Sequence, residues 1–386
     1  MKTIVLGDII REIVEKTTIN NQHPVLTSSQ SGLVSQGEYF NKQIASQDNT
    51  GYKIIRKGQF TYRAMSDTGR FYINQSPYEI GIVSPAYPVF EIIEDGHVLP
   101  EYIATYFRSD PFQNAIALQS TGSTRVSLKL GKIKDISIDI PSVSEQKEIL
   151  ENINEVESLI GSRREQLEKL DELVKSRFIE LFGTVKNNPH GYPVVRIGEC
   201  AKLQGGFAFK SSDYIDDGIR LVQISNVNKD TLDWDSVNYV PQAFLQKYKD
   251  FELHIGDLVL AMTRPVIKSL DAVKIATVSE YDVPSLLNQR VGRFVIDRAK
   301  LNVVYLMSCC QMTEFREYVE AMSGNSLQPN ISSKQVENYS IILPPMELQE
   351  QFDSFVKQTD KSKLAIQESL AELETLKKAL MQKYFG

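Results

Sequence analysis

Two stretches of the chain carry apolar residues at alternating spacings of three and four, a pattern typical of a helix face that packs against another helix. One stretch lies between Pro141 and Gly183, and the other between Pro344 and Gly386. The prolines close extended segments and the glycines stand where helices commonly end. We predict two helices of about 40 residues, each about 60 Å long. Their seam residues are Ile149, Ile153, Val156, Ile160, Leu167, Leu170, Val174, Leu181, Phe352, Val356, Ile366, Leu370, Leu373, Leu380 and Tyr384.

Helices of this length cannot bury an apolar stripe against themselves, so each needs a partner. The two stripes have equal length and phase, which favours pairing of the two helices within one chain, either antiparallel or parallel. A parallel pairing avoids contacts between like charges equally well, so the seam alone does not determine the direction. Pairing of each seam with a second chain, in a homodimer, is the other alternative.

The two helical stretches belong to a long internal repeat. Residues 137–183 align without a gap with residues 340–386, an offset of 203. A repeat this long, containing a helix and a globular segment, indicates two related halves and a pseudo-twofold arrangement. Identical residues recur from Ser137, Ile138, Pro141, Gln146, Glu165, Leu167, Leu170, Leu173, Lys175, Phe182 and Gly183.

The segments before the helices show short β-rich runs, glycine and asparagine turns, and helical patterning near 99–118 and 301–322. We therefore predict an α+β chain in which two globular α/β domains alternate with the two long helices. The predicted domain boundaries are 1–140, 141–183, 184–343, with 184–193 as a linker, and 344–386.

Charge changes this picture little. The net charge is −6, and the segments 141–183 and 344–386 account for −4 and −1 of it when their charged residues are counted. The globular segments are thus nearly neutral, which neither supports nor excludes a nucleic-acid partner. No apolar run approaches the length of a membrane span. The N-terminus resembles folded sequence rather than a signal peptide, and three cysteines argue against a disulfide framework, so we expect a cytoplasmic protein.

Polar loops of both globular segments hold the candidate DNA contacts. They combine Arg or Lys, which bind phosphate or guanine, with Gln or Asn, which bind adenine, and with hydroxyl groups. The alternative is that the small polar residues simply form turns. The candidates are Ser28, Ser29, Gln30, Arg63, Arg70, Tyr72, Ser123, Thr124, Arg125 and Lys129 in the first segment, and Lys210, Ser211, Ser212, Arg264, Lys268, Gln289, Arg290, Asn325, Ser326, Gln328 and Asn330 in the second.

Sequence patterns of catalysis are missing. The chain has no GxxxxGK[ST] loop, no GxGxxG unit between a strand and a helix, and no Asn-Pro-Pro-aromatic tetrapeptide. Its four histidines are scattered, without cysteine or carboxylate at metal-ligand spacing. We predict no catalytic residues, no metal site and no cofactor in this chain.

The combination of motifs and repeat resembles the specificity (S) subunit of type I restriction–modification systems. The residues that carry the resemblance are FAFKSSDY at 207–214, IGDLVLAMTR at 255–264, LLNQRVGRF at 286–294 and 324–349 in the second half, with 28–48 and 122–149 in the first. The departures are Ser142-Val143 and Glu347-Leu348, where proline-leucine and serine-glutamate are commoner.

The resemblance implies a non-catalytic subunit. Each globular segment would be a target recognition domain that reads one half of a bipartite site in double-stranded DNA. The two helices would pack as an intramolecular antiparallel coiled coil and act as a spacer. Two adenine-N6 methyltransferase (M) subunits would dock on the helices and hold S-adenosylmethionine. Two restriction (R) subunits would use ATP and Mg. No membrane contact is implied.

Two other functions remain open from the sequence. One is a coiled-coil scaffold or interaction protein that binds no nucleic acid. The other is an enzyme, a nuclease or a methyltransferase, with motifs too divergent to recognise.

Overall fold

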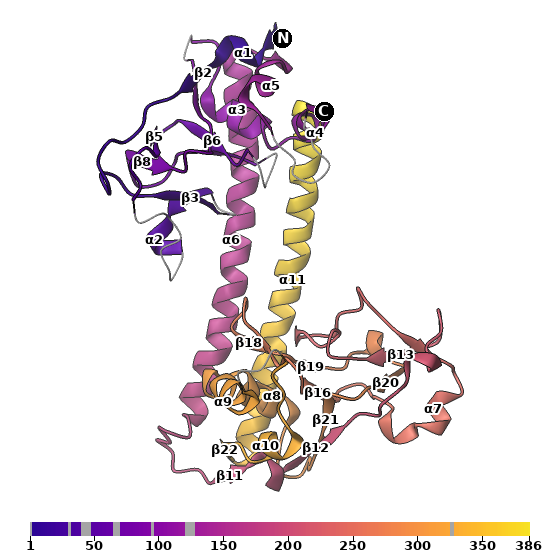
Figure 1. The fold of residues 1–386 in the computed structure, drawn as a ribbon. Coiled ribbons are helices and arrows are strands. Elements are labelled where there is room, and N and C mark those ends of the chain that lie inside the picture. Colours follow the sequence, from indigo (N-terminus) through magenta and orange to yellow (C-terminus); the bar gives the residue numbers. More distant parts are fainter. Residues whose placement is uncertain are drawn as a thin grey trace. The chain divides into compact units, whose positions relative to one another are not determined.

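The computed structural model describes residues 2–29, 32–39, 48–64, 70–93, 96–119, 128–324 and 328–386. The chain forms two compact units, one of residues 1–164 with 367–386 and the other of residues 165–366. We call them unit 1 and unit 2. Each mixes helices with small sheets (Figure 1), so the predicted α+β class is confirmed.

Unit 1 is built around a four-stranded sheet in the order β2-β9-β6-β7. The pairs β1-β10, β3-β4 and β5-β8 are separate two-stranded sheets. The elements are β1 (Lys2–Val5), α1 (Leu6–Ile9), β2 (Ile10–Ile13), β3 (Leu26–Ser29), β4 (Gly32–Ser35), α2 (Gln36–Tyr39), β5 (Lys53–Arg56), β6 (Phe60–Tyr62), β7 (Phe71–Ile73), β8 (Ile80–Val83), β9 (Val89–Ile92), α3 (Pro100–Tyr106), α4 (Asp110–Gln119), α5 (Leu130–Lys134) and β10 (Ser137–Ile140).

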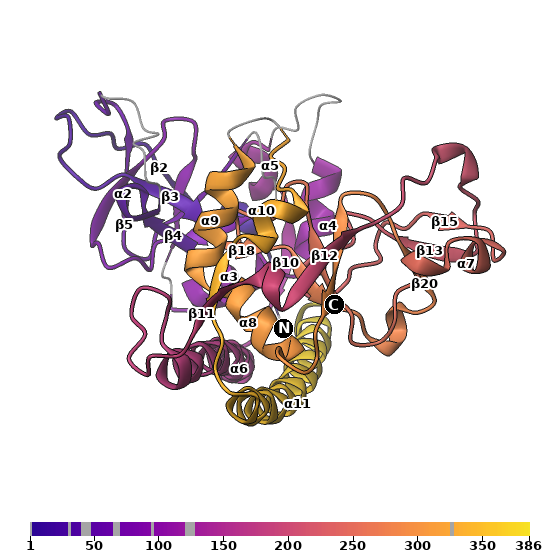
Figure 2. The ribbon, with the colours of Figure 1, turned by 90° about the horizontal axis from the view of Figure 1, so that it is seen from below.

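Unit 2 has a five-stranded sheet in the order β12-β21-β16-β19-β14 and a three-stranded sheet in the order β15-β13-β20. The smaller sheet and α7 lie on the side of this unit away from α9 in both views (Figure 1, Figure 2). The strands are β11 (Val194–Arg196), β12 (Ala201–Gly205), β13 (Ile219–Val222), β14 (Lys229–Asp230), β15 (Tyr239–Val240), β16 (Leu258–Ala261), β17 (Val266–Ile267), β18 (Ala272–Val273), β19 (Ile275–Thr277), β20 (Ser285–Leu287), β21 (Val291–Ile296) and β22 (Ser340–Ile342). The helices are η1 (Ile197–Glu199), η2 (Ser211–Asp213), α7 (Phe244–Lys247), η3 (Lys249–Phe251), η4 (Glu280–Asp282), α8 (Val303–Gln311), α9 (Thr313–Ser323) and α10 (Ser333–Glu337).

Each long helix contributes one half to each unit. Helix α6 runs over Val143–Phe182 and helix α11 over Met346–Phe385, as the apolar spacing predicts. A capping box begins α6, since the Ser142 N–H donates to the Glu145 carboxylate at 2.8 Å and the Glu145 N–H donates to the Ser142 hydroxyl at 3.4 Å. Each compact unit therefore contains part of both long helices, whereas the sequence predicts each helix as a segment of its own.

The helical patterning near 99–118 and 301–322 predicts a helix near the end of each globular segment, but neither stretch is a single helix. Each stretch forms two shorter helices, α3 with α4 and α8 with α9. Pro111 lies in the first turn of α4, where proline is tolerated, but it cannot continue a preceding helix. In the second half Met312 has ψ 148°, an extended conformation that separates α8 from α9.

Within each unit the two helices run antiparallel. In unit 1, the Asn152 side chain donates to the Tyr384 hydroxyl at 2.9 Å, and Lys377 pairs with Glu157 at 2.7 Å. In unit 2, Lys363 pairs with Asp171 at 2.6 Å, and Phe352 packs against Phe178 and Phe182 with ring centroids 5.5 Å apart. None of the fifteen predicted seam residues is exposed; Ile149, Ile153, Val156, Ile160 and Phe352 are buried and the other ten are half-buried.

A buried glutamine fixes the start of each long helix. Gln146 accepts from the Leu99 N–H at 2.9 Å and donates to the His97 and Pro141 carbonyls at 2.7 and 3.0 Å. Gln349 repeats all three bonds 203 residues later, to Asn302, Lys300 and Pro344. Both side chains are inaccessible to solvent. The identity of this residue in the repeat therefore has a structural cause.

Aromatic packing completes the repeat. Tyr102 packs against Phe385 with ring centroids 5.4 Å apart in unit 1, and the equivalent pair Tyr305 and Phe182 lies 4.8 Å apart in unit 2.

The turns before β6 and β16 use glycine in the left-handed region, with φ +81° at Gly58 and +83° at Gly256. No helix within the described ranges is long and apolar enough to cross a bilayer.

Candidate nucleic-acid interface

In unit 2, three predicted loops converge at one end of the pair β16–β21. Ala261 pairs with Val291 in this antiparallel ladder, and the next residue, Met262, donates its N–H to the Arg290 carbonyl at 2.7 Å. The Arg264 N–H donates to the Pro329 carbonyl at 2.8 Å. Segments separated in sequence therefore form one surface. We call Arg264, Lys274, Gln289, Arg290 and Asn330 the arginine edge.

Both arginines of this edge have left-handed backbones. The φ angle is +48° at Arg264 and +69° at Arg290, a region that costs free energy for residues other than glycine. The main-chain bonds to Pro329 and Met262 hold them there. Strained residues of this kind cluster at functional sites.

The arginine edge has an excess of positive charge. Arg264 and Arg290 are exposed, and neither guanidinium has a hydrogen bond or a carboxylate partner among the residues that the structure describes. Lys274, which is half-buried, donates to the Ile224 carbonyl at 3.2 Å. Burial, and next the nearby Arg264, lower the pKa of Lys274. Such an edge favours an anionic partner.

The segment after Gly206 borders the arginine edge. The Gln289 N–H donates to the Phe207 carbonyl at 2.8 Å. A Cβ atom at Gly206 would lie 2.2 Å from the Asn288 carbonyl oxygen, so only glycine allows this approach. Three predicted contacts, Lys210, Ser211 and Ser212, follow on this segment and are exposed.

The remaining predictions in unit 2 have different outcomes. Asn330 and Gln328 are exposed; the Asn330 amide donates to the Gln328 carbonyl at 2.9 Å, and its oxygen accepts from the Thr263 hydroxyl. Lys268 is exposed between β17 and β18. Asn325 and Ser326 lie outside the described residues.

Unit 1 places its candidates in the equivalent region. The Leu128 N–H donates to the Ala64 carbonyl at 2.9 Å, as the Ile331 N–H does to the Met262 carbonyl at 2.8 Å in unit 2. Arg63 and Lys129 border this bond; Arg63 is half-buried and Lys129 is exposed. Arg70 is exposed and Tyr72 packs half-buried against the β3 side of the core. Gln30, Ser123, Thr124 and Arg125 lie outside the described residues.

Ser28 and Ser29 require a correction. Both lie in β3 and are only 5% and 7% exposed. The Ser29 hydroxyl donates to the Gly32 carbonyl at 2.9 Å, and the Ser28 carbonyl accepts from Arg63 at 3.2 Å. The pairing of β3 with β4 encloses them, so their side chains do not face a DNA duplex.

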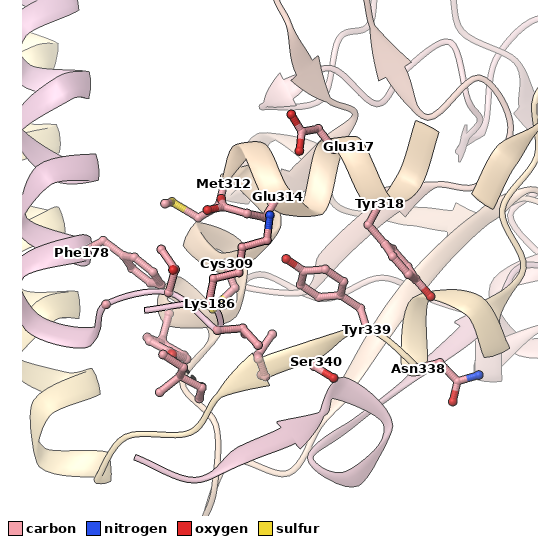
Figure 3. Close-up of a pocket in the computed structure, with 16 residues that line it drawn as sticks. Phe178, Lys186, Cys309, Met312, Glu314, Glu317, Tyr318, Asn338, Tyr339 and Ser340 are labelled. Carbon is pink, nitrogen blue, oxygen red and sulfur yellow. Dashed lines mark hydrogen bonds between the residues drawn. The ribbon is translucent and has the colours of Figure 1, made fainter. Parts of the chain in front are cut away.

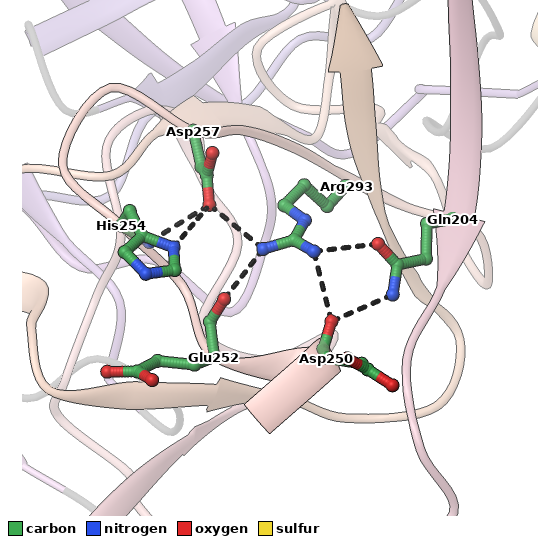
Figure 4. A network of polar contacts seen from close by, with 6 residues as sticks. All are labelled: Gln204, Asp250, Glu252, His254, Asp257 and Arg293. Atoms are coloured by element: carbon green, nitrogen blue, oxygen red, sulfur yellow. Dashed lines mark hydrogen bonds and ion pairs between the residues drawn. The ribbon is translucent and has the colours of Figure 1, made fainter. Parts of the chain in front are cut away.

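Arg293 has a structural role. This side chain, 15% exposed, donates to the Glu252 and Asp250 carbonyls at 2.6 and 3.0 Å and to the Gln204 side chain at 2.7 Å (Figure 4). It also pairs with Asp257 at 3.3 Å. It connects β12, β21 and the η3 turn, so it is not free to bind DNA although it stands in the predicted VGRF motif.

A pocket of about 440 Å³ lies in unit 2, where α8, α9, β22 and the end of α6 meet (Figure 3). Phe178, Tyr305, Tyr318 and Tyr339 supply aromatic walls. Burial raises the pKa of the Cys309 thiol to about 12, which makes it a poor nucleophile. Across the described ranges no three His, Cys, Asp or Glu side chains are grouped to hold a metal.

The long helices repeat a surface as well as a core. Glu165, Leu173 and Lys175 are exposed on α6, and their identical counterparts Glu368, Leu376 and Lys378 are exposed on α11. Leu173 and Leu376 keep 48% and 46% of their surface open to solvent. Core packing does not require identity at exposed positions, so these residues are candidates for contacts with a partner.

Comparison with known proteins gives consistent matches. The family model described as type I restriction modification DNA specificity domain matches residues 3–172 and again 189–376. The MjaVIII specificity subunit of Methanocaldococcus jannaschii is 28% identical over 68% of this chain and 64% of its own length. The EcoAI specificity subunit of Escherichia coli is 28% identical over 45% of this chain and 28% of its own length. The chain thus spans less than two thirds of the length of these two relatives.

Two solved structures share the fold. One was solved for the structural basis underlying complex assembly and conformational transition of the type I R-M system. Its TM-score is 0.58 and its sequence identity 19%, and the match covers 100% of this chain and 97% of the other. The second is the type I restriction-modification S subunit from M. genitalium, with a TM-score of 0.56 and 12% identity over 100% and 96%.

Proposed function

Because the chain belongs to the type I restriction–modification DNA specificity family, we propose that it selects the DNA sequence on which such a system acts. Specificity subunits are the non-catalytic components of these systems. The arginine edge is the observation that carries the proposal, since it combines exposed amides with two exposed arginines that have no carboxylate partner within the described ranges. Arginine binds both phosphate and the edge of guanine, and amide groups pair with adenine.

The target is bipartite in this proposal. Residues 1–140 and 184–343 are target recognition domains, each reading one half of a double-stranded site. Helices α6 and α11 pair along their whole length as an intramolecular antiparallel coiled coil and act as a spacer between the two readers. The antiparallel contacts within each unit and the two family matches support this arrangement.

The exposed, repeated residues of the helices are the docking sites of two copies of one partner. An adenine-N6 methyltransferase subunit is that partner, and it holds S-adenosylmethionine. Two restriction subunits that use ATP and Mg complete the complex. Two copies of one partner are supported by the repeat of the exposed surface, in which Glu165, Leu173 and Lys175 recur at Glu368, Leu376 and Lys378.

Arg264→Asn and Arg290→Asn are each expected to weaken DNA binding without changing the thermal midpoint of the chain. Asparagine tolerates the left-handed backbone, so the substitution removes the charge with little strain. The loss is about 1–3 kcal/mol of discrimination where the arginine contacts a base edge, and a similar weakening at every DNA sequence where it contacts a phosphate. Binding of the full chain to duplex DNA, measured by fluorescence anisotropy, gives the affinity.

The matched control is Arg298→Asn. Arg298 is exposed just beyond the other end of β21, and its loss is expected to leave DNA affinity unchanged. If all three variants bind like the wild type, the arginine edge is not the interface. A wild-type chain that assembles with methyltransferase but binds no DNA would instead favour a coiled-coil scaffold.

A further inference from the structure

Main-chain hydrogen bonds place Lys274 beside the turn that carries Arg264. Its N–H donates to the Pro265 carbonyl at 2.7 Å, and its carbonyl accepts from the Ala261 N–H at 3.0 Å. Main-chain bonds thus tie Lys274 to the strand on both sides of Arg264. The side chain is half-buried and bonds to the Ile224 carbonyl at 3.2 Å. No sequence motif had identified this residue.

The environment of Lys274 disfavours a positive charge in the free protein. The pKa of the ammonium is lowered by burial and, to a smaller extent, by Arg264. Within the part of the chain that the structure describes, neither cation has a carboxylate partner. A desolvated ammonium beside a guanidinium costs free energy unless an anion compensates it. The single carbonyl acceptor satisfies only one of the three N–H groups of the ammonium.

We propose that Lys274 and Arg264 together bind one phosphate group of the DNA backbone, which leaves Arg290 to contact a base. This inference rests on the proposed DNA-binding function. A phosphate supplies a negative charge, and acceptor oxygens beyond the Ile224 carbonyl, which the described part of the chain does not offer to these two side chains. Lysine is a compact charge suited to a phosphate, whereas the forked guanidinium of arginine also matches the edge of guanine.

Lys274→Met in the full chain tests the proposal, because methionine keeps the apolar stem and removes the charge. We expect binding to a duplex of random sequence to weaken about tenfold at low salt. The slope of log K against log salt, measured between about 50 and 200 mM, should become less steep by about 0.9. The thermal midpoint should equal or exceed that of the wild type, because an unfavourable charge is gone.

A purely structural lysine predicts the opposite stability change. If Lys274 serves only to bond Ile224, then Lys274→Met lowers the thermal midpoint and leaves the salt slope unchanged, and the phosphate site is refuted. Lys274→Arg keeps the charge and should keep the slope. Arg298→Met, beyond the opposite end of β21, should also keep it; a change there would show that any lost cation flattens the slope.

Two further results separate this inference from the function on which it depends. If the wild type binds duplex DNA and its slope of log K against log salt equals that of Lys274→Met, the phosphate site is refuted while the DNA-binding function stands. Wild-type chain that binds no duplex refutes the proposed function itself. If inorganic phosphate raises the thermal midpoint of the wild type but not of Lys274→Met, while the DNA slopes agree, the site binds free phosphate and the DNA assignment is wrong.

Discussion

Ile153→Asp is expected to destabilise unit 1 by about 4 kcal/mol or more, a large part of the free energy of unfolding of a typical domain. Ile153 is fully buried on α6 and packs with Ile149 and the aromatic core of unit 1. An aspartate there has no cation to pair with in that apolar cluster, so its charge would be desolvated without compensation. Urea denaturation of the full chain, followed by circular dichroism, measures the loss.

Leu159→Asp is the matched control on the same helix. Leu159 is 43% exposed, so an aspartate there costs a few tenths of a kcal/mol of helix propensity but buries no charge. Apart from the change in helix propensity, Leu159→Asp should lower the free energy of unfolding by about 0.5 kcal/mol at most. Equal destabilisation by both variants would contradict the assignment of the α6 face that is buried in unit 1.

Gln349→Leu is expected to lower the free energy of unfolding of unit 2 by about 3–5 kcal/mol. Leucine has a similar size but leaves the Asn302 N–H and the Lys300 and Pro344 carbonyls without their side-chain partner. Each buried polar group left unpaired costs about 1–3 kcal/mol. The shift of the urea midpoint at constant slope measures the change.

The repeat supplies two comparisons for this substitution. Gln146→Leu removes the same three bonds in unit 1 and should cost a similar amount. Gln351→Leu, at an exposed position of α11, should cost little. A Gln349→Leu variant as stable as Gln351→Leu would show that these bonds do not hold the start of the helix.

Much of the helical part of the fold is predictable because local periodicity determines it. The spacing of Ile149, Ile153 and Val156 indicates a buried face, and Pro141 and Gly183 mark its limits. Comparing the two halves of the sequence at the repeat offset also identifies Gln146 and Gln349 as identical. It does not reveal why, since the three main-chain partners of each glutamine lie in loops and strand ends without a pattern of their own.

The arginine edge is less predictable from the sequence because the pairing of distant strands creates it. Arg264, Arg290 and Asn330 meet only when β16 pairs with β21 and residue 330 bridges to 263. Ser28 and Ser29 resemble other polar loop residues in sequence, yet β3 buries them. Lys274 stands in no motif, and only the two main-chain bonds that place it beside Arg264 single it out.

In the proposed function, one chain reads two separate pieces of DNA sequence for a methyltransferase that docks on it. Mapping adenine methylation across the genome of cells that contain this chain and its methyltransferase subunit tests the claim most directly. We predict methylation within a two-part sequence whose parts are separated by an unread spacer of constant length, and relaxed sequence preference in one part alone for Arg290→Asn. Methylation at a single uninterrupted sequence, or a pattern that persists when this chain is deleted, would contradict it.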